Sequence, residues 1–219
     1  MSLNGKFVWR SARTFRVLLA VACVACTGAS ARDAATPIDF GKNEIGTAPA
    51  RLALSPGLWT AVHAATTDAG IATEQPAVRK AKDRYALAIY QTASIKNAEI
   101  NLRLEPAGGK SEERGIAVRL SDPQNYYLVQ VDAQSDRVLF ARVSNGVSEE
   151  IVGVDADIAS QAWHTLTVRA VDNEFTVSLD GDWVFTAFDK TLSQEGRIAL
   201  WSKGDSVTRF DQIEVAPLP

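Results

Sequence analysis

Cysteine is scarce in this chain, and its only two cysteines, Cys23 and Cys26, lie together near the N-terminus. They fall within an apolar stretch without flanking polar structure, so a redox or metal-binding Cys-x-x-C site is not expected. Residues 32–219 have no cysteine, which excludes disulfides and thiolate metal sites there. That part of the chain must therefore fold on its apolar core alone, for which an apolar fraction of 46% is sufficient.

Acidic residues are absent from the first 31 positions, which carry four basic residues. Removing those four from the total of 23 leaves 19 basic against 26 acidic residues, a net charge of −7 for the remainder. Because an acidic body repels phosphate backbones, nucleic acid is not expected as a partner.

Long apolar runs are missing, and the longest, 17–26, is too short to cross a bilayer as a helix. It follows the basic segment and precedes Ala29-Ser30-Ala31, with small residues where signal peptidase cleaves. We predict a signal peptide over 1–31 and an exported mature chain, periplasmic or secreted, without a transmembrane segment. Two alternatives stay open: a buried N-terminal helix, and a lipid anchor at Cys23 or Cys26, although neither cysteine has a leucine-like residue three positions before it. The long basic segment also leaves open a start further downstream.

Residues 32–219 alternate short apolar runs with turns, and within each run every second residue is apolar. This period is typical of strands with one buried and one wet face. Asn145-Gly146 and Asp180-Gly181 predict two-residue hairpins, whereas the polar segment 74–84 predicts a loop or a short helical turn. A single all-β sandwich over 32–219 is the simplest organisation. The runs are 100–104, 116–120, 126–131, 138–143, 166–170, 175–179, 183–188, 197–202 and 208–215.

Four segments carry a family resemblance: RLSDPQNYY at 119–127, WHTLTV at 163–168, SLDGDWVF at 178–185 and GRIALWSKGDSVTRFDQIEV at 196–215. In this order they resemble the 3-keto-disaccharide hydrolase family, long catalogued as a domain of unknown function, over about residues 37–217. The chain departs from the family pattern where Ala199 replaces a glycine, Ser202 a threonine, Gly204 an alanine and Gln212 an aspartate.

The resemblance implies a concanavalin A-like jelly-roll β-sandwich of two antiparallel sheets, related to laminin G-like modules and to family 16 glycoside hydrolases. It also implies a saccharide-related role, either hydrolysis of 3-keto-glycosides, whose oxidised C3 makes the glycosidic bond labile, or carbohydrate binding without catalysis. The matching motifs are mainly those that build strands and turns, so they do not decide between these activities.

Catalytic residues are not indicated by the sequence. A glycosidase needs two carboxylates about 5–10 Å apart, and no E-x-D-x-E pattern places such a pair on one strand face. Asp155 and Asp157 have the right spacing but lie in a polar, turn-like stretch, which favours a solvated loop. His164 has the parity of a buried residue and is expected to be structural, and nothing assigns a role to His63.

Metal ligands are few, since the chain has two histidines and residues 32–219 have no cysteine, so zinc is not expected. Calcium is the one cofactor with candidate ligands, from Asp122 with Asn125 or from Asp205 with Asp211. The interpretation that we prefer is that Asp122 caps the Asp-Pro turn while Asn125 binds loop backbone. No cofactor is therefore predicted.

A sugar-binding face is the main functional hypothesis. Sugars stack on aromatic rings and bind charged and amide groups through their hydroxyls. Trp201 and Lys203 share a parity opposite to the core-facing residues of their strand, and so does Arg119. If these strands are neighbours in one sheet, the three side chains converge. The candidate ligand-binding residues are Arg119, Asp122, Asn125, Tyr127, Trp201, Lys203 and Asp205.

The alternative is that Trp201 belongs to the core and Arg119 pairs with Asp205 or Asp211 as a structural contact. Trp163 and Trp183 are expected in the core or between the sheets. The functional hypothesis is accordingly an exported protein that binds glycans or hydrolyses 3-keto-glycosides. Its alternative is a non-catalytic structural or protein-interaction module of the cell envelope. Neither the sugar nor the oligomeric state follows from the sequence.

Overall fold

The computed structural model describes residues 36–38, 52–54, 60–63, 71–75, 85–91, 93–204 and 206–219. Every regular element in these ranges is a strand, which confirms the predicted all-β class. No helix in the described part of the chain is long and apolar enough to cross a membrane. The predicted signal segment 1–31 lies outside the described residues.

The elements follow in chain order. They are β1 (Thr36–Ile38), β2 (Leu52–Leu54), β3 (Thr60–His63), β4 (Ile71–Gln75), β5 (Tyr85–Tyr90), β6 (Ala98–Gly109), β7 (Glu113–Asp122), β8 (Asn125–Asp132), β9 (Arg137–Ser144), β10 (Val147–Asp155), β11 (His164–Val171), β12 (Glu174–Leu179), β13 (Asp182–Phe188), β14 (Arg197–Lys203) and β15 (Ser206–Pro217).

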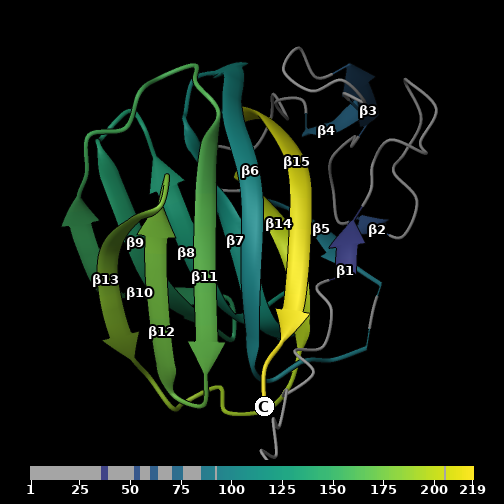
Figure 1. The fold of residues 1–219 in the computed structure, drawn as a ribbon, viewed down its shortest axis with the longest axis vertical. Helices are drawn as coiled ribbons and strands as arrows, with labels where there is room; N and C mark the ends of the chain where they lie inside the picture. The colour runs from purple at the N-terminus through teal and green to yellow at the C-terminus, as the bar shows by residue number, and fades with distance from the viewer. Residues whose placement is uncertain are drawn as a thin grey trace, which may run out of the picture. The chain divides into compact units, whose positions relative to one another are not determined.

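The strands form two antiparallel sheets that lie face to face (Figure 1). The eight-stranded sheet has the order β13-β12-β11-β6-β15-β4-β3, with β1 beside β15, and the seven-stranded sheet has the order β10-β9-β8-β7-β14-β5-β2. Strands distant in sequence are neighbours in both, because β6 lies between β11 and β15 and β14 lies between β7 and β5. This is the two-sheet sandwich that the strand pattern and the resemblance predict.

The main core lies between the two sheets. Strand β6 alternates buried and half-buried residues along most of its length, as the period-two pattern predicts. The rings of Tyr127, Phe140 and Phe175 meet at centroid distances of 4.6 to 5.3 Å in the middle of this core. The sandwich is thus held by apolar packing between side chains from both sheets.

A second apolar cluster lies on the other face of the seven-stranded sheet, which we call the far face. All its members come from that sheet, and they alternate along the strands with residues of the main core. Trp201 therefore belongs to the far face, whereas Ile198 and Leu200 of the same strand belong to the core, as their parity predicts. The buried members are Leu87, Ile89, Ala117, Leu120, Tyr126, Leu128, Val143, Ala199 and Trp201.

Candidate functional site

Three polar side chains meet on the far face, on strands β7, β8 and β14. The Lys203 ammonium donates to both Glu113 carboxylate oxygens at 3.1 Å, and Gln130 Nε2 donates to Glu113 Oε2 at 3.1 Å. Ser202 lies opposite Arg114 and Gly115 lies opposite Gln130, so strand register brings the trio together. The Lys203 and Glu113 side chains are 31% and 23% exposed, so the trio faces solvent while each member is held by another.

Aromatic rings adjoin this trio on the same face. Tyr85 lies opposite Lys203 in strand register, and its ring stacks on Trp201 at 6.2 Å between centroids and contacts Tyr126 edge-on at 6.1 Å. The Tyr85 hydroxyl donates to the Pro123 carbonyl at 2.8 Å, which fixes the ring. Trp201 is only 5% exposed, and Tyr85 is half-buried. The accessible aromatic surface of this cluster is therefore that of Tyr85, with Trp201 packed against it.

Burial affects two polar groups of these rings, the Tyr126 hydroxyl and the Trp201 indole nitrogen. It raises the pKa of Tyr126 above the usual tyrosine value, because the charged phenolate is disfavoured away from water. The Trp201 indole nitrogen Nε1 is buried, and the Tyr126 hydroxyl is the polar group that interacts with it. Together with the polar trio, the rings make the far face the best candidate for a ligand site.

Arg119 does not join this face, contrary to the sequence prediction. Strand β7 has a β-bulge between Val118 and Asp122, and Arg119 adopts φ 50° within it. The extra residue reverses the parity, so Leu120 lies in the far-face cluster while Arg119 lies 4.9 Å from the Phe175 ring of the core. Arg119 Nε donates to the Lys96 carbonyl at 3.1 Å. The predicted convergence of Arg119 with Trp201 and Lys203 is therefore wrong.

The alternative that pairs Arg119 with Asp211 is also wrong, because the hydrogen bonds of Arg119 in the described part of the chain go to backbone carbonyls. The alternative partner, Asp205, lies outside the described residues. Besides Lys96, Arg119 Nη1 donates to the Leu192 carbonyl at 3.5 Å. The guanidinium nearest to Asp211 is that of Arg103, at 3.9 Å. Burial raises the pKa of Asp211. Arg119 thus helps hold the connection between β13 and β14 in place.

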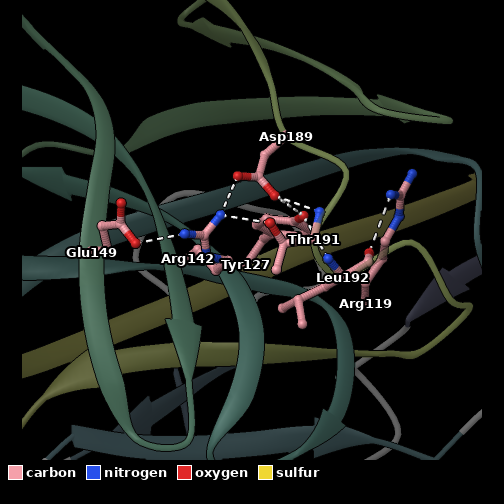
Figure 2. Close-up of polar contacts among 7 residues, drawn as sticks. All are labelled: Arg119, Tyr127, Arg142, Glu149, Asp189, Thr191 and Leu192. Carbon is pink, nitrogen blue, oxygen red and sulfur yellow. Dashed lines mark hydrogen bonds and ion pairs between the residues drawn. The ribbon is translucent and has the colours of Figure 1, made fainter.

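Tyr127 supports the same connection from inside the core (Figure 2). It is fully buried, and its hydroxyl donates to Asp189 Oδ1 at 2.5 Å and accepts from the Leu192 backbone N–H at 2.9 Å. Burial, with the hydrogen bond to Asp189, raises the pKa of Tyr127 to about 12. Arg142 also donates to the Asp189 carboxylate and to Thr191 Oγ1. Because Tyr127 has no exposed surface, it stabilises this connection and cannot contact a ligand directly.

Asp122 and Asn125 form the turn between β7 and β8, as the preferred interpretation predicts. Asp122 Oδ1 accepts from the Gln124 backbone at 2.7 Å and from Asn125 Nδ2 at 3.1 Å, and these bonds lower the pKa of Asp122, the Gln124 bond most. Asn125 Oδ1 accepts from the Asn145 backbone at 3.0 Å. Asp205 lies outside the described residues. Within the described ranges no three histidine, cysteine or acidic side chains gather as metal ligands do.

Of the remaining sequence predictions, some are confirmed by the structure and others are wrong. His164 is buried, and its ring nitrogens contact Asp180 Oδ2 at 2.7 Å and the Ala159 carbonyl at 2.8 Å, which confirms a structural role. Asp155 and Asp157 are exposed, as a solvated stretch requires. Trp183 is 67% exposed, so its predicted packing in the core is wrong.

Trp163 is also outside the core. It is half-buried beneath the Arg103 guanidinium, whose central carbon lies 5.0 Å from the ring centroid. A cation over an aromatic face is attracted by the ring quadrupole, which explains why this tryptophan lies at the surface without being open to solvent.

Sequence reasoning missed Glu113, Gln130 and Tyr85. That these three residues lie on the same face as Trp201 and Lys203 becomes clear only when the register between β5, β7, β8 and β14 is known. A usable signal was present, because Glu113 has the parity of Gly115 and Ala117, opposite to that of Ile116 and Val118. This signal is weak because Glu113 is a single carboxylate on its strand face, without the paired acidic residues that a glycosidase pattern requires.

Comparison with known proteins identifies the kind of domain. A family model described as a 3-keto-alpha-glucoside-1,2-lyase-like domain matches residues 55–216. A search of curated proteins finds no match.

Solved structures share the fold at low identity. A carbohydrate binding module, CBM66, from Bacillus subtilis is 22% identical, with 76% of this chain and 95% of that chain covered and a TM-score of 0.64. A putative glycosyl hydrolase from Parabacteroides distasonis is 16% identical, with 81% and 98% covered and a TM-score of 0.54. A Bacillus subtilis protein with a galectin-like fold is 9% identical, with 75% and 88% covered and a TM-score of 0.58.

Proposed function

The chain belongs to the family of 3-keto-alpha-glucoside-1,2-lyase-like domains, and on that premise we propose that it binds carbohydrate on the far face, through Glu113, Gln130 and Lys203 with Tyr85 beside them. The observation that carries the proposal is the contact of one carboxylate with both an ammonium and an amide, next to an accessible aromatic ring. Family membership makes carbohydrate the appropriate ligand class.

The chemistry of the trio suits vicinal hydroxyl groups. A carboxylate accepts hydrogen bonds from hydroxyls, an ammonium donates to them, and an amide does both. Because Lys203 and Gln130 each hold Glu113 at 3.1 Å, the three groups are oriented before a ligand arrives. The apolar face of the sugar ring then packs on Tyr85, whose own ring is fixed by Trp201 and by the Pro123 carbonyl.

Binding is tested on a glycan microarray with the wild-type protein and the variants Glu113→Gln and Lys203→Met. We expect wild-type binding and a loss of at least tenfold in each variant. Glu195→Gln and Lys190→Met are matched controls, since both residues are exposed in the connection between β13 and β14. Binding that is equal in all five proteins would contradict the proposed site. No glycan signal, together with a protein partner captured by cross-linking, would favour an interaction module.

Cleavage of 3-keto-glycosides is the second candidate, and the pairing of Glu113 with Lys203 favours it. Hydrolysis through two carboxylates has little support, because Glu113 is the only carboxylate in the trio. Elimination needs a single base. Glu113 would remove the C2 proton, acidified by the C3 ketone, while Lys203 donates to the ketone oxygen. The electron pair then forms the C1–C2 double bond as the C1–O bond breaks, and the proton that Glu113 took from C2 passes to the oxygen of the departing aglycone.

Incubation with p-nitrophenyl 3-keto-α-glucoside tests this second candidate, with p-nitrophenol release as the readout. If the reaction occurs at the trio, Glu113→Gln lowers kcat by at least 100-fold while Lys190→Met leaves it unchanged. The absence of release from the wild-type protein, with binding retained on the array, would leave a binding domain.

Export completes the proposal and rests on the signal predicted for residues 1–31. Mass spectrometry of the protein recovered from outside the cytoplasm is expected to show a mature N-terminus at Arg32. A lipid-modified N-terminal cysteine at position 23 or 26 would replace the soluble form with an anchored one. Recovery of the uncleaved chain from the cytoplasm alone would contradict export.

A further inference from the structure

Two large aromatic side chains stand exposed on the edge strand β13 of the eight-stranded sheet. Trp183 is 67% exposed and Phe188 is 62% exposed. Tryptophan is highly buried on average in folded proteins, so an indole with two thirds of its surface in water is unusual. Both residues belong to the sheet opposite the one that carries Glu113 and Lys203, so the far-face site does not account for them.

A β-bulge turns Trp183 outward. Strand β13 pairs Val177 with Phe185 and Ser178 with Trp183, so an irregularity lies between these two pairs. Without it, Trp183 would share the parity of Phe185 and Ala187, which are both in the core. With it, Trp183 lies on the outer face beside Ser178. The bulge thus exposes a residue that the alternating pattern would bury.

The exposed indole is held in place by a hydroxyl. Trp183 Nε1 donates to Thr186 Oγ1 at 3.3 Å, and Thr186 Oγ1 lies 3.2 Å from Thr176 Oγ1 on the neighbouring strand. Arg169 is exposed opposite Thr176 on β11, which extends the same row of polar groups. The aromatic ring is therefore fixed against a hydroxyl-lined sheet surface.

We infer that this surface, formed by Trp183, Phe188, Thr176, Ser178 and Thr186, is a second carbohydrate-binding site, which takes a polysaccharide chain. Trp183 pairs with Ser178 and Phe188 pairs with Glu174, four residues apart on β12. At about 3.3 Å per residue, the two aromatics are separated by about 13 Å. A chain of sugar rings lying along β13 stacks on both aromatics, while its hydroxyls reach the threonine and serine hydroxyls between them.

A polysaccharide fits this surface better than a protein partner. Stable protein interfaces bury about 1,200–2,000 Å² with an apolar centre, whereas here polar side chains separate two single aromatics. A hydroxylated polymer matches the row of threonine and serine hydroxyls, beside which Arg169 and Glu174 offer further groups for hydrogen bonds to sugar hydroxyls. The choice of ligand class rests on the proposed function, but the site itself is separate from Glu113, Gln130 and Lys203.

The test is affinity gel electrophoresis through gels that contain dextran, pullulan, laminarin or hydroxyethylcellulose. At least one polymer is expected to retard the wild-type protein, and Trp183→Ala is expected to weaken that retardation at least fivefold. Thr186→Val, which removes the acceptor that holds the indole, is expected to weaken it less. Val147→Ala, at a residue that is 69% exposed on the edge strand of the other sheet, is the matched control and should change nothing.

The double variant E113Q/K203M separates this inference from the proposed function. If W183A weakens the retardation and the double variant leaves it unchanged, the Trp183 surface is established as a binding site. This conclusion holds whatever the glycan array shows for the far face. If only the double variant weakens retardation, the inference is wrong and the far-face proposal stands. It is also wrong if none of the four polymers retards the wild-type protein. Because Trp183 is exposed, thermal unfolding of W183A should match the wild type and exclude misfolding.

Discussion

The Tyr127 hydroxyl donates to the Asp189 carboxylate at 2.5 Å, which joins strand β8 to the connection that follows β13. Tyr127 is fully buried, so removal of its hydroxyl takes one buried donor from Asp189 and leaves the Leu192 N–H without its acceptor. Hydrogen bonds to charged groups contribute about 1.5–3 kcal/mol. We expect Tyr127→Phe to lower the free energy of unfolding by about that amount in urea titrations. Tyr85→Phe, which loses a bond to a neutral carbonyl at a half-buried position, should cost about 1 kcal/mol or less.

Asp189 should make stability depend on acidic pH. Burial alone would raise its pKa, but hydrogen bonds from Tyr127 and Thr191 and the charge of Arg142 together hold it below the usual value. A depressed pKa in the folded state stabilises the fold above the unfolded value of about 3.9, and this contribution disappears as pH falls through the folded pKa. Urea unfolding between pH 6 and pH 2 should therefore show falling stability in the wild type. Asp189→Asn should be less stable at pH 6 and show a shallower decline. Parallel pH profiles for the two proteins would contradict this account.

Gly196 should resist substitution because the backbone of β7 passes close to it. A Cβ at this position would lie 2.4 Å from the Arg119 carbonyl carbon and 2.7 Å from the Leu120 nitrogen. Backbone atoms cannot move aside, so Gly196→Ala should destabilise by about 2 kcal/mol or more, measured by urea unfolding. At Gly153 the nearest atom to an added Cβ is the end of the Arg137 side chain, which can move. Gly153→Ala should therefore lower the free energy of unfolding by less than Gly196→Ala does. Equal losses in the two variants would contradict the geometry.

Arg114 is a buried charge that the fold tolerates at a cost. It is fully buried, Nη1 donates to the Glu112 carbonyl at 2.5 Å, and Nε and Nη2 have no hydrogen-bond partner in the described part of the chain. Burial lowers its pKa to about 10. Replacing buried charges by apolar side chains of similar volume is often neutral or stabilising by about 1–4 kcal/mol. We expect Arg114→Met to raise Tm in scanning calorimetry, while Arg169→Met at an exposed position leaves it unchanged. A lower Tm for Arg114→Met would show that the guanidinium has a required partner.

The fold was predictable because period-two alternation is a local property of the sequence. Ile198 and Leu200 lie in the main core and Trp201 on the opposite face, as their parities require. Alternation no longer predicts which face a side chain lies on where a β-bulge adds an extra residue to a strand. Bulges reverse the orientation of Arg119 in β7 and of Trp183 in β13, and neither bulge is marked by a glycine at the irregular position. Both wrong predictions therefore have one physical cause.

The site was predictable only in part. Lys203 was expected on an accessible face, but its partners Glu113 and Gln130 come from two other strands. Which residues lie opposite one another depends on register, which is fixed by long-range packing rather than by any single strand. Asp122 and Asn125 contrast with this, because an Asp-Pro turn is specified by adjacent residues and could be predicted directly.

Isothermal titration of the best ligand from the glycan array into four proteins tests the central claim most directly. Those proteins are the wild type, Glu113→Gln, Lys203→Met and the control Lys190→Met. The far-face site predicts that the first two variants bind at least tenfold more weakly, a loss of about 1.4 kcal/mol or more, and that Lys190→Met binds as the wild type does. Unchanged affinity in both far-face variants, with their folds intact, would show that the carbohydrate binds elsewhere.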